Sequence, residues 1–334
     1  MRWNARKWRS DGRRRGRRIV TALAAALVLP VAAGVAGTAV AGATPGAPVH
    51  QAPNGGYQEL LIPSSMGPIK VQVQWARRGG NAALILLDGM EARNDRNAWS
   101  FETNAMRQFA NDNLTLVMPV GGRSSLYTDW YGTSNFNGQQ VTYKWETFLT
   151  KELPAYLGKL GVSPNNYGIA GLSMAGSSAL ATAAYHRNQF KFAASFSGAL
   201  NISAPGMREA MRLALLKAGG YNIDAMWGPP WGPGWLRNDP FVFAPRLRGM
   251  SMYISSGDGI PQLKDFAMGP VDLMSAMGIE IICALNTRAF QARMQLLNIA
   301  ATYDFGWTGV HSWSYWQDEL WHARNQILDA LHAH

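Results

Sequence analysis

Residues 167–185 read Tyr-Gly-Ile-Ala-Gly-Leu-Ser-Met-Ala-Gly-Ser-Ser-Ala-Leu-Ala-Thr-Ala-Ala-Tyr. The run 167–172 is typical of a buried strand, and 174–185 is rich in the helix-former Ala. Between them, small residues stand two before and two after Ser173. A sharp strand–turn–helix of this kind lifts a serine hydroxyl above the sheet and aims the N–H of the next residue, Met174, at a reacting oxyanion. The stretch therefore predicts a nucleophile elbow at Ser173. The alternative is a chance Gly-x-Ser-x-Ala in Ala-rich sequence.

Strands and helices alternate on both sides of this elbow. Strands are expected at 58–63, 69–75, 82–87, 114–120, 167–172, 192–196 and 250–255, and helices at 145–157, 174–185, 286–297 and 314–331. The first two strands alternate apolar and polar residues and suggest a pair, whereas 82–87 and 114–120 are continuous apolar runs. One face of the last helix collects Trp316, Leu320, Ala323, Ile327 and Leu331. The pattern predicts an α/β fold with a sheet that is mostly parallel in its centre and flanked by helices.

The composition suits a large folded domain. The chain has 334 residues, of which 47% are hydrophobic and 16% charged, which excludes a coiled coil and a charge-rich disordered chain. Its one cysteine, Cys283, excludes an internal disulfide framework and a multi-cysteine metal site. Residues 220–245 hold three Trp and five Pro and predict an ordered loop insertion over one end of the sheet. This insertion is either a rigid surface loop or a substrate-facing one.

The N-terminus has the pattern of an export signal. A basic run to Arg18 precedes the uncharged apolar run 19–40, and small residues end at Ala41. We expect a signal peptide over 1–41, a flexible leader over 42–56 and the functional domain over 57–334. An uncleaved membrane anchor is the alternative, since the apolar run is about as long as a membrane span. Arg17-Arg18 hints at twin-arginine export. The remaining body is expected to be soluble and to lie outside the cytoplasm, secreted or in the cell envelope.

The positive charge lies mainly in that N-terminus. The formal net charge is +10, and residues 1–41 hold nine Lys/Arg and one acid, so their removal leaves +2. Phosphate contacts need clustered cations. The nearly neutral body therefore gives no support to nucleic-acid binding.

The general base can be found by elimination among the six histidines. His50 lies in the leader, and His332 and His334 end the chain, where ends fray. His186 closes the helix that begins at Ser173, ~15 Å from the elbow, and His322 falls within the final helix. His311 stands in a loop before that helix, where the chain order Ser, acid, His places the base. A structural loop histidine is the alternative.

The acid is less clear from pattern alone. Asp258 follows the strand 250–255, where many hydrolases with this elbow carry the acid, and pattern alone slightly favours it. Asp265 and Glu280 follow later in the chain. The weaker candidates are Asp272 and Asp304.

Nine stretches of the body form a longer pattern. In chain order they are Ser65-Met-Gly-Pro-Ile-Lys-Val, Leu86-Leu-Asp-Gly, Val117-Met-Pro-Val-Gly-Gly, Ser124-Ser-Leu-Tyr-Thr-Asp-Trp-Tyr131, Tyr143-Lys-Trp-Glu-Thr-Phe-Leu149, Gly171-Leu-Ser-Met-Ala175, Ala225-Met-Trp-Gly228, Arg237-Asn-Asp-Pro240 and His311-Ser-Trp313. Together they resemble the secreted mycolyltransferases of the antigen 85 family, over about residues 57–331. The resemblance implies an α/β-hydrolase fold. It implies transfer of a mycolyl chain from trehalose monomycolate to a second trehalose monomycolate or to cell-wall arabinogalactan.

The resemblance also implies catalytic roles. By position Ser173 matches the nucleophile, His311 the base and Glu280 the acid, since the spacing from Glu280 to Phe290 resembles the family's stretch after its catalytic Glu. This match outweighs the pattern-based preference for Asp258. No metal or redox cofactor is implied.

Substrate contacts carry over in the same way. The backbone N–H groups of Met90 and Met174 match the oxyanion hole. Asp88 matches a trehalose-contacting carboxylate, and Trp313 an aromatic residue beside the sugar. The alternative for Asp88 is a turn residue that binds its own backbone. The implied partners are trehalose mycolates and arabinogalactan, with peripheral contact to the outer mycolate layer.

The chain departs from the family at several positions. Glu91 stands where the family usually has Arg; Arg93, two residues on, is included among the substrate-binding candidates. Ser256 stands where the family has a Cys, and Leu296–Gly309 replaces a Gly-rich stretch before the base. The segment before Asn113 lacks the pattern linked to fibronectin binding in relatives, and that activity is not carried over.

Two other functions stay open from the sequence. The same three side chains could serve a secreted carboxylesterase that uses water as the acceptor. A non-catalytic cell-wall or glycan-binding protein could share the fold, although retention of all three side chains favours an enzyme.

Overall fold

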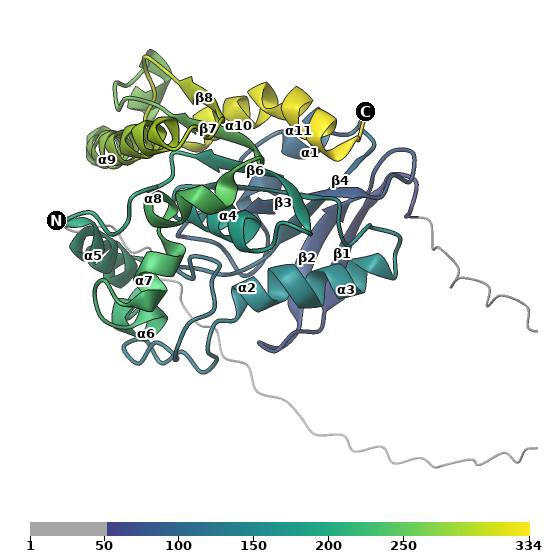
Figure 1. The fold of residues 1–334 in the computed structure, drawn as a ribbon, viewed down its shortest axis with the longest axis horizontal. Coiled ribbons are helices and arrows are strands. Elements are labelled where there is room, and N and C mark those ends of the chain that lie inside the picture. Colours follow the sequence, from purple (N-terminus) through teal and green to yellow (C-terminus); the bar gives the residue numbers. More distant parts are fainter. Residues whose placement is uncertain (1–51) are drawn as a thin grey trace, which may run out of the picture. The chain divides into compact units, whose positions relative to one another are not determined.

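The computed structural model describes residues 52–334, and Figure 1 shows their arrangement. The expected signal peptide, 1–41, and residues 42–51 of the leader lie outside the described residues. A sheet of eight strands runs through the domain in the order β1-β2-β4-β3-β5-β6-β7-β8. The strands are β1 Tyr57–Ile62, β2 Ile69–Gln74, β3 Ala82–Leu87, β4 Leu114–Pro119, β5 Tyr167–Leu172, β6 Phe190–Phe196, β7 Ser251–Ser256 and β8 Thr302–Phe305.

The pairing follows the apolar patterns of the strands. β1 pairs antiparallel with β2, and β2 antiparallel with β4. All pairs from β4 through β3, β5, β6 and β7 to β8 are parallel. β3, β4 and β5 are buried along their whole length. Such strands need helices on both faces of the sheet, which gives the expected α/β-hydrolase fold.

The helices form two layers. They are α1 Ala105–Gln108, α2 Trp145–Thr147, α3 Leu153–Gly158, α4 Met174–Tyr185, α5 Met207–Gly219, α6 Ile223–Trp227, α7 Pro233–Asn238, α8 Pro240–Phe243, α9 Pro270–Leu296, α10 Trp313–His322 and α11 Arg324–Leu331. Side chains of α1, α10 and α11 share one apolar core with the sheet. Those of α2 to α9 share the other core, on the opposite face (Figure 1).

Most expected elements are confirmed within two residues of their ends, and the expected face of the final helix is buried at all five positions. The expected final helix is two helices, α10 and α11, which meet at Ala323. The expected insertion at 220–245 is wrong as a loop, because α6, α7 and α8 account for much of it. The expected helix at 286–297 begins earlier, at Pro270, and this brings Glu280 into α9.

The register of the sheet brings the site together. Leu87 pairs with Gly171, and Gly171 pairs with Ser195. Because these strands are parallel, the residues that follow them leave the sheet at the same edge. Asp88 and Ser173 therefore emerge near one another.

Candidate active site

The turn after β5 is an elbow that only small residues allow. Ser173 has φ 51° and ψ −122°, a backbone conformation that L-residues rarely adopt. A Cβ on Gly171 would lie 2.2 Å from the backbone oxygen of Ala175. A Cβ on Gly176 would lie 2.5 Å from Ser195 Oγ. Strain of this kind persists where the surrounding structure imposes it, and it gathers at functional sites.

Ser173, His311 and Glu280 form one chain of hydrogen bonds. Ser173 Oγ lies 2.8 Å from His311 Nε2. On the other side of the ring, His311 Nδ1 lies 2.7 Å from Glu280 Oε2. His311 thus touches Ser173 with one ring nitrogen and Glu280 with the other. This is the geometry of a serine–histidine–carboxylate triad.

Glu280 is buried and fully hydrogen-bonded. Its Oε1 accepts from Ser197 Oγ at 2.7 Å, from Ser256 Oγ at 3.1 Å and from the Gly257 N–H at 2.7 Å. Burial alone would raise its pKa, but the bonds from His311 and these donors outweigh burial and hold the pKa below its usual value. Glu280 is therefore a carboxylate at neutral pH, the form that can orient and stabilise a protonated imidazole.

The sequence does not predict Ser197 as a hydrogen-bond donor to Glu280. Ser197 has φ 50°, and its Oγ also accepts from Trp316 Nε1 at 3.0 Å. The Trp316 ring in turn packs edge-on against His311, with centroids 4.8 Å apart. The strand end Phe196-Ser197 beside the elbow was the available signal, since β6 is parallel to β5.

The other carboxylate candidates lie elsewhere. Asp258 Oδ1 accepts from the N–H of Ile260, as in a local turn. Asp265 accepts from the Tyr315 hydroxyl, and Asp272 opens α9. The pattern-based preference for Asp258 is therefore wrong, because the side chain that contacts His311 comes from the middle of α9.

Three of the other described histidines contact carboxylates outside the cavity that holds Ser173. His186 Nε2 lies 2.8 Å from Glu146 Oε1. His322 and His334 lie beside Asp304 and Asp329. The elimination that left His311 agrees with its contact to Ser173.

Two backbone N–H groups flank the nucleophile. Met174 opens α4 directly after Ser173, and Met90 lies in the loop after β3. Within residues 52–334 neither N–H donates to a protein acceptor. Both residues line the cavity that holds Ser173, and the Met90 carbonyl accepts from the Ser124 N–H at 3.0 Å, which fixes its loop.

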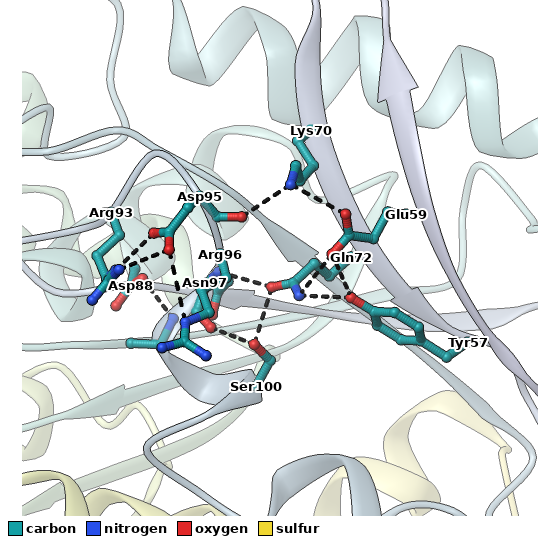
Figure 2. Close-up of polar contacts among 11 residues, drawn as sticks. Tyr57, Glu59, Lys70, Gln72, Asp88, Arg93, Asp95, Arg96, Asn97 and Ser100 are labelled. Atoms are coloured by element: carbon teal, nitrogen blue, oxygen red, sulfur yellow. Dashed lines mark hydrogen bonds and ion pairs between the residues drawn. The ribbon is translucent and has the colours of Figure 1, made fainter. Parts of the chain in front are cut away.

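A polar network holds the loop after β3 from behind, as Figure 2 shows. Buried Gln72, on β2, accepts the Asn97 N–H at 2.8 Å through its side-chain oxygen. Asn97 Nδ2 donates to the carbonyls of Leu86 and Pro119, at the ends of β3 and β4. The loop that carries Met90 is thus fixed to three strands.

Asp88 anchors the start of that loop. Its Oδ1 accepts from the Gly89 N–H at 2.9 Å and its Oδ2 from the Ala98 N–H at 2.8 Å. The side chain lines the cavity but is only 2% exposed. Burial raises the pKa of Asp88 to about 6, against the lowering effect of the two N–H groups.

We expect Asp88→Asn to destabilise the fold. The amide offers one acceptor in place of two, so one buried N–H loses its partner, which costs about 1–3 kcal/mol. With a raised folded pKa, the ionisable Asp88 contributes stability that is full below pH 3.8 and is lost as the pH rises through about 6. The difference in Tm between the unsubstituted protein and Asp88→Asn should therefore narrow from pH 4 to pH 8, as measured by thermal melts.

Enzyme assays separate this anchoring role from a sugar contact. Loop loosening should slow hydrolysis of a small activated ester and sugar-dependent transfer alike. Loss of transfer alone, with unchanged melts, would contradict anchoring and favour a direct contact of Asp88 with sugar.

The cavity around Ser173 has a volume of 690 Å³. Apolar side chains line much of it, among them Leu126, Ile202, Met207, Met211, Ile279 and Ile282. Charged side chains line it as well, namely Asp88, Glu91, Arg93, Glu102, Arg123 and Lys217. An ester with a long apolar acyl chain and a polyhydroxyl head would find a matching wall for each part. No residue of 220–245 lines this cavity.

Two further substrate-binding candidates lie in its wall. Arg93 donates to both oxygens of Asp95 at 2.7 Å, so its guanidinium is held beside the cavity (Figure 2). Trp313 packs edge-on against Trp99 and Trp316, with centroids 5.4 and 5.2 Å apart. Exposed Glu91 lines the same cavity.

One group within residues 52–334 has donor atoms close enough to share a metal ion. The ligand atoms of Asp304, Glu319 and His322 lie within 4.8 Å of one another. The Tyr253 hydroxyl lies 3.1 Å from Asp304 Oδ2 and 2.8 Å from Glu319 Oε2. None of these residues lines the cavity that holds Ser173.

Comparison with known proteins places the chain in a family. A family model described as a putative esterase matches residues 63–327. The diacylglycerol acyltransferase/mycolyltransferase Ag85C of Mycobacterium avium is 40% identical over 323 residues, which are 93% of this chain and 86% of that protein. Ag85B of Mycolicibacterium smegmatis is 41% identical and covers 91% of this chain and 93% of its own length. The chain belongs to the antigen 85 family.

A solved structure agrees with this assignment. MPT51 (FbpC1) of Mycobacterium tuberculosis superposes with a TM-score of 0.72 at 28% identity, over 83% of this chain and 99% of that one. The antigen 85 resemblance stated from nine sequence stretches is therefore confirmed, together with the α/β-hydrolase fold. The range that the family model matches, residues 63–327, contains Ser173, Glu280 and His311.

Proposed function

We propose that this chain is a secreted acyltransferase that moves a mycolyl chain through an acyl-Ser173 intermediate. The donor is trehalose monomycolate, and the acceptor is a second trehalose monomycolate or cell-wall arabinogalactan. One observation carries the proposal: the hydrogen-bonded chain from Ser173 through His311 to buried Glu280 opens into a cavity with an apolar wall and a polar one. The choice of a mycolyl group follows from the antigen 85 relatives, which are named mycolyltransferases and are 40% and 41% identical to this chain.

The three side chains divide the chemistry. A serine hydroxyl is a weak nucleophile at neutral pH and needs a base. His311 takes the Ser173 proton as the hydroxyl attacks the ester carbonyl, and Glu280 stabilises the imidazolium that forms. His311 then gives this proton to the leaving trehalose oxygen. The N–H groups of Met90 and Met174 donate to the oxyanion, and each such donor is worth roughly 3–4 kcal/mol.

Transfer requires that a sugar hydroxyl reach the acyl-enzyme before water does. The polar part of the cavity wall holds Asp88, Arg93 and Trp313 near the nucleophile. Arg93 and Trp313 bind the acceptor sugar in the proposed reaction, while Asp88 anchors the loop that carries Met90. His311 removes the proton from its hydroxyl, which attacks the acyl-Ser173 ester. As the acyl–oxygen bond to Ser173 breaks, His311 returns this proton to Ser173 Oγ.

Incubation with trehalose monomycolate tests the proposal. The protein should release trehalose and form trehalose dimycolate, as measured by lipid analysis. Free mycolic acid as the main product would identify a carboxylesterase instead. No product, with no labelling of Ser173 by an active-serine probe, would favour a glycan-binding protein.

The protein acts outside the cytoplasm in this account, and residues 1–41 are its export signal. We expect cleavage after Ala41, because small residues close the apolar run there. The intact mass of protein recovered from the culture medium should correspond to a chain that begins at Gly42. A retained N-terminus would support the anchored alternative.

A further inference from the structure

Exposed apolar side chains gather on one part of the surface. Of the 23 large hydrophobic side chains that are exposed within residues 52–334, ten lie between residues 260 and 285. They are Ile260, Leu263, Phe266 and Met268, in and beside the 3-10 turns Leu263–Met268, and Val271, Met274, Ile279, Ile281, Ile282 and Leu285 on α9. Such a concentration marks an interaction surface rather than scattered surface residues.

On α9 five of these six side chains form a stripe opposite its buried face. At 100° per residue, Val271, Met274, Ile281, Ile282 and Leu285 fall within an arc of about 100°. The buried residues of the helix, which include Leu273, Glu280 and Phe290, centre on the opposite side. The outer face of a surface helix is ordinarily polar, and here it is apolar. We call these five side chains the α9 stripe.

The α9 stripe does not cross a membrane. Within the described residues α9 is the one helix whose length and composition would suffice for a span. Its other face packs in the core, however, and carries Glu280 to His311. A helix with one face in a protein core and an apolar outer face lies along a lipid surface rather than through it.

The stripe continues into the acyl cavity. Ile279, Ile282 and Cys283 line the cavity that holds Ser173, and Ile279 and Ile282 are also exposed. A second copy of the chain seated on the stripe would cover this rim. If a lipid layer lay at the same place, an acyl chain could pass from the layer to Ser173 along apolar side chains.

The charge of this surface fits an uncharged partner. Residues 258–288 hold six charged side chains, namely Asp258, Lys264, Asp265, Asp272, Glu280 and Arg288. Asp265 and Glu280 are buried, so two cations and two anions remain at the surface. Attraction to anionic lipids needs several clustered cations, which this surface lacks.

We propose that the α9 stripe, with the adjoining turns 260–268, docks the protein onto a neutral lipid layer and feeds its acyl chains into the Ser173 cavity. The proposal rests on the proposed function, in which that cavity accepts a lipid acyl chain. The occupant is the lipid surface itself, held by burial of apolar side chains. Electrostatic attraction contributes little.

A fluorescent label at the stripe tests docking without any reaction. Leu285 and Leu61, the latter on β1, are each 67% exposed and form a matched pair. An environment-sensitive dye on Leu285→Cys should shift to the blue on phosphatidylcholine vesicles, while the dye on Leu61→Cys should not. Added phosphatidylglycerol should change neither result. The unsubstituted protein gives the background of buried Cys283, whose pKa burial raises.

Two results would overturn docking. One is an unshifted dye at position 285 on both kinds of vesicle. The other is a shift without vesicles that grows with protein concentration, which would show a second copy on the stripe. The labelled protein begins at Gly42 and lacks the apolar run 19–40, so that run cannot produce the expected shift.

A charged stripe links docking to transfer. Met274→Glu with Leu285→Glu places two carboxylates on the stripe, outside the cavity wall. Transfer from trehalose monomycolate in phosphatidylcholine vesicles should fall by about tenfold or more, because a charged face resists burial in lipid. Hydrolysis of a soluble short ester should stay at the unsubstituted level, as should both activities of Leu61→Glu. Undiminished vesicle transfer by the doubly charged variant would contradict the proposal. If the proposed function is wrong but docking is right, the dye at position 285 will shift on vesicles and the unsubstituted protein will transfer no mycolyl chain.

Discussion

Ser173→Ala should abolish acyl transfer and leave the fold intact. The hydroxyl forms the acyl ester in the proposed mechanism, and the methyl group of alanine offers no oxygen for that ester. Removal of a triad nucleophile costs about 10⁴-fold or more in kcat, with the remainder due to the oxyanion donors and binding. The rates of turnover of trehalose monomycolate and of a small activated ester should both fall to the rate measured without enzyme.

The fold should survive because alanine meets the demands of the elbow. The side chain at this position must be small enough for a turn at φ 51°, and Ala175 already shows that a methyl group is accepted nearby. The thermal melt of Ser173→Ala should coincide with that of the unsubstituted protein to within a few degrees. Near-normal turnover by a folded Ser173→Ala would show that another group carries the acyl chain.

Glu280→Gln should cripple turnover, whereas Asp258→Asn should leave it nearly unchanged. Glutamine keeps the shape of Glu280 but presents a neutral amide to His311 Nδ1, so the ring loses its orienting carboxylate. The comparable change in serine proteases lowers kcat about 10⁴-fold. Asp258 contacts the Ile260 N–H and not His311, which makes Asp258→Asn the matched control.

The pH behaviour of Glu280 adds a second measurement. Its folded pKa lies below 4.5, so its contribution to stability is complete above that value and is lost as the pH falls through the folded pKa. Glu280→Gln should remove this part of the acid-side loss of stability. Equal losses of kcat in the two variants would contradict the assignment of Glu280, and a greater loss in Asp258→Asn would reverse it.

The fold could be predicted from the sequence because its strands are short apolar runs between clear turns. The buried runs 82–87 and 167–172 match β3 and β5 at both ends. β8 was not predicted, because Thr302–Phe305 is brief and only half-buried. The sequence also does not predict the first half of α9. Residues 270–285 are apolar on the outer face as well as the buried one, so they lack the alternation of apolar and polar faces that indicates a helix.

Local pattern singled out Ser173 and His311 but not Glu280, the third side chain of the hydrogen-bonded chain. The strand–turn–helix pattern around Ser173 predicts a nucleophile elbow. The positions of the other five histidines argue against a role as base and favour His311. Glu280 reaches His311 from a helix rather than from a strand end, and spacing within one chain does not show that contact. Its position came from the family resemblance instead. The hydrogen bonds from Ser197 and Ser256 to Glu280 depend on strand order, which the sequence did not provide.

The central claim is that the mycolyl chain passes through an ester on Ser173. Mass spectrometry of peptides from protein quenched in acid during turnover of trehalose monomycolate tests it most directly. The account predicts a mycolyl adduct on the peptide that contains Ser173, and no adduct on Ser173→Ala. Formation of trehalose dimycolate with the adduct on another residue, or an equal adduct on Ser173→Ala, would contradict it.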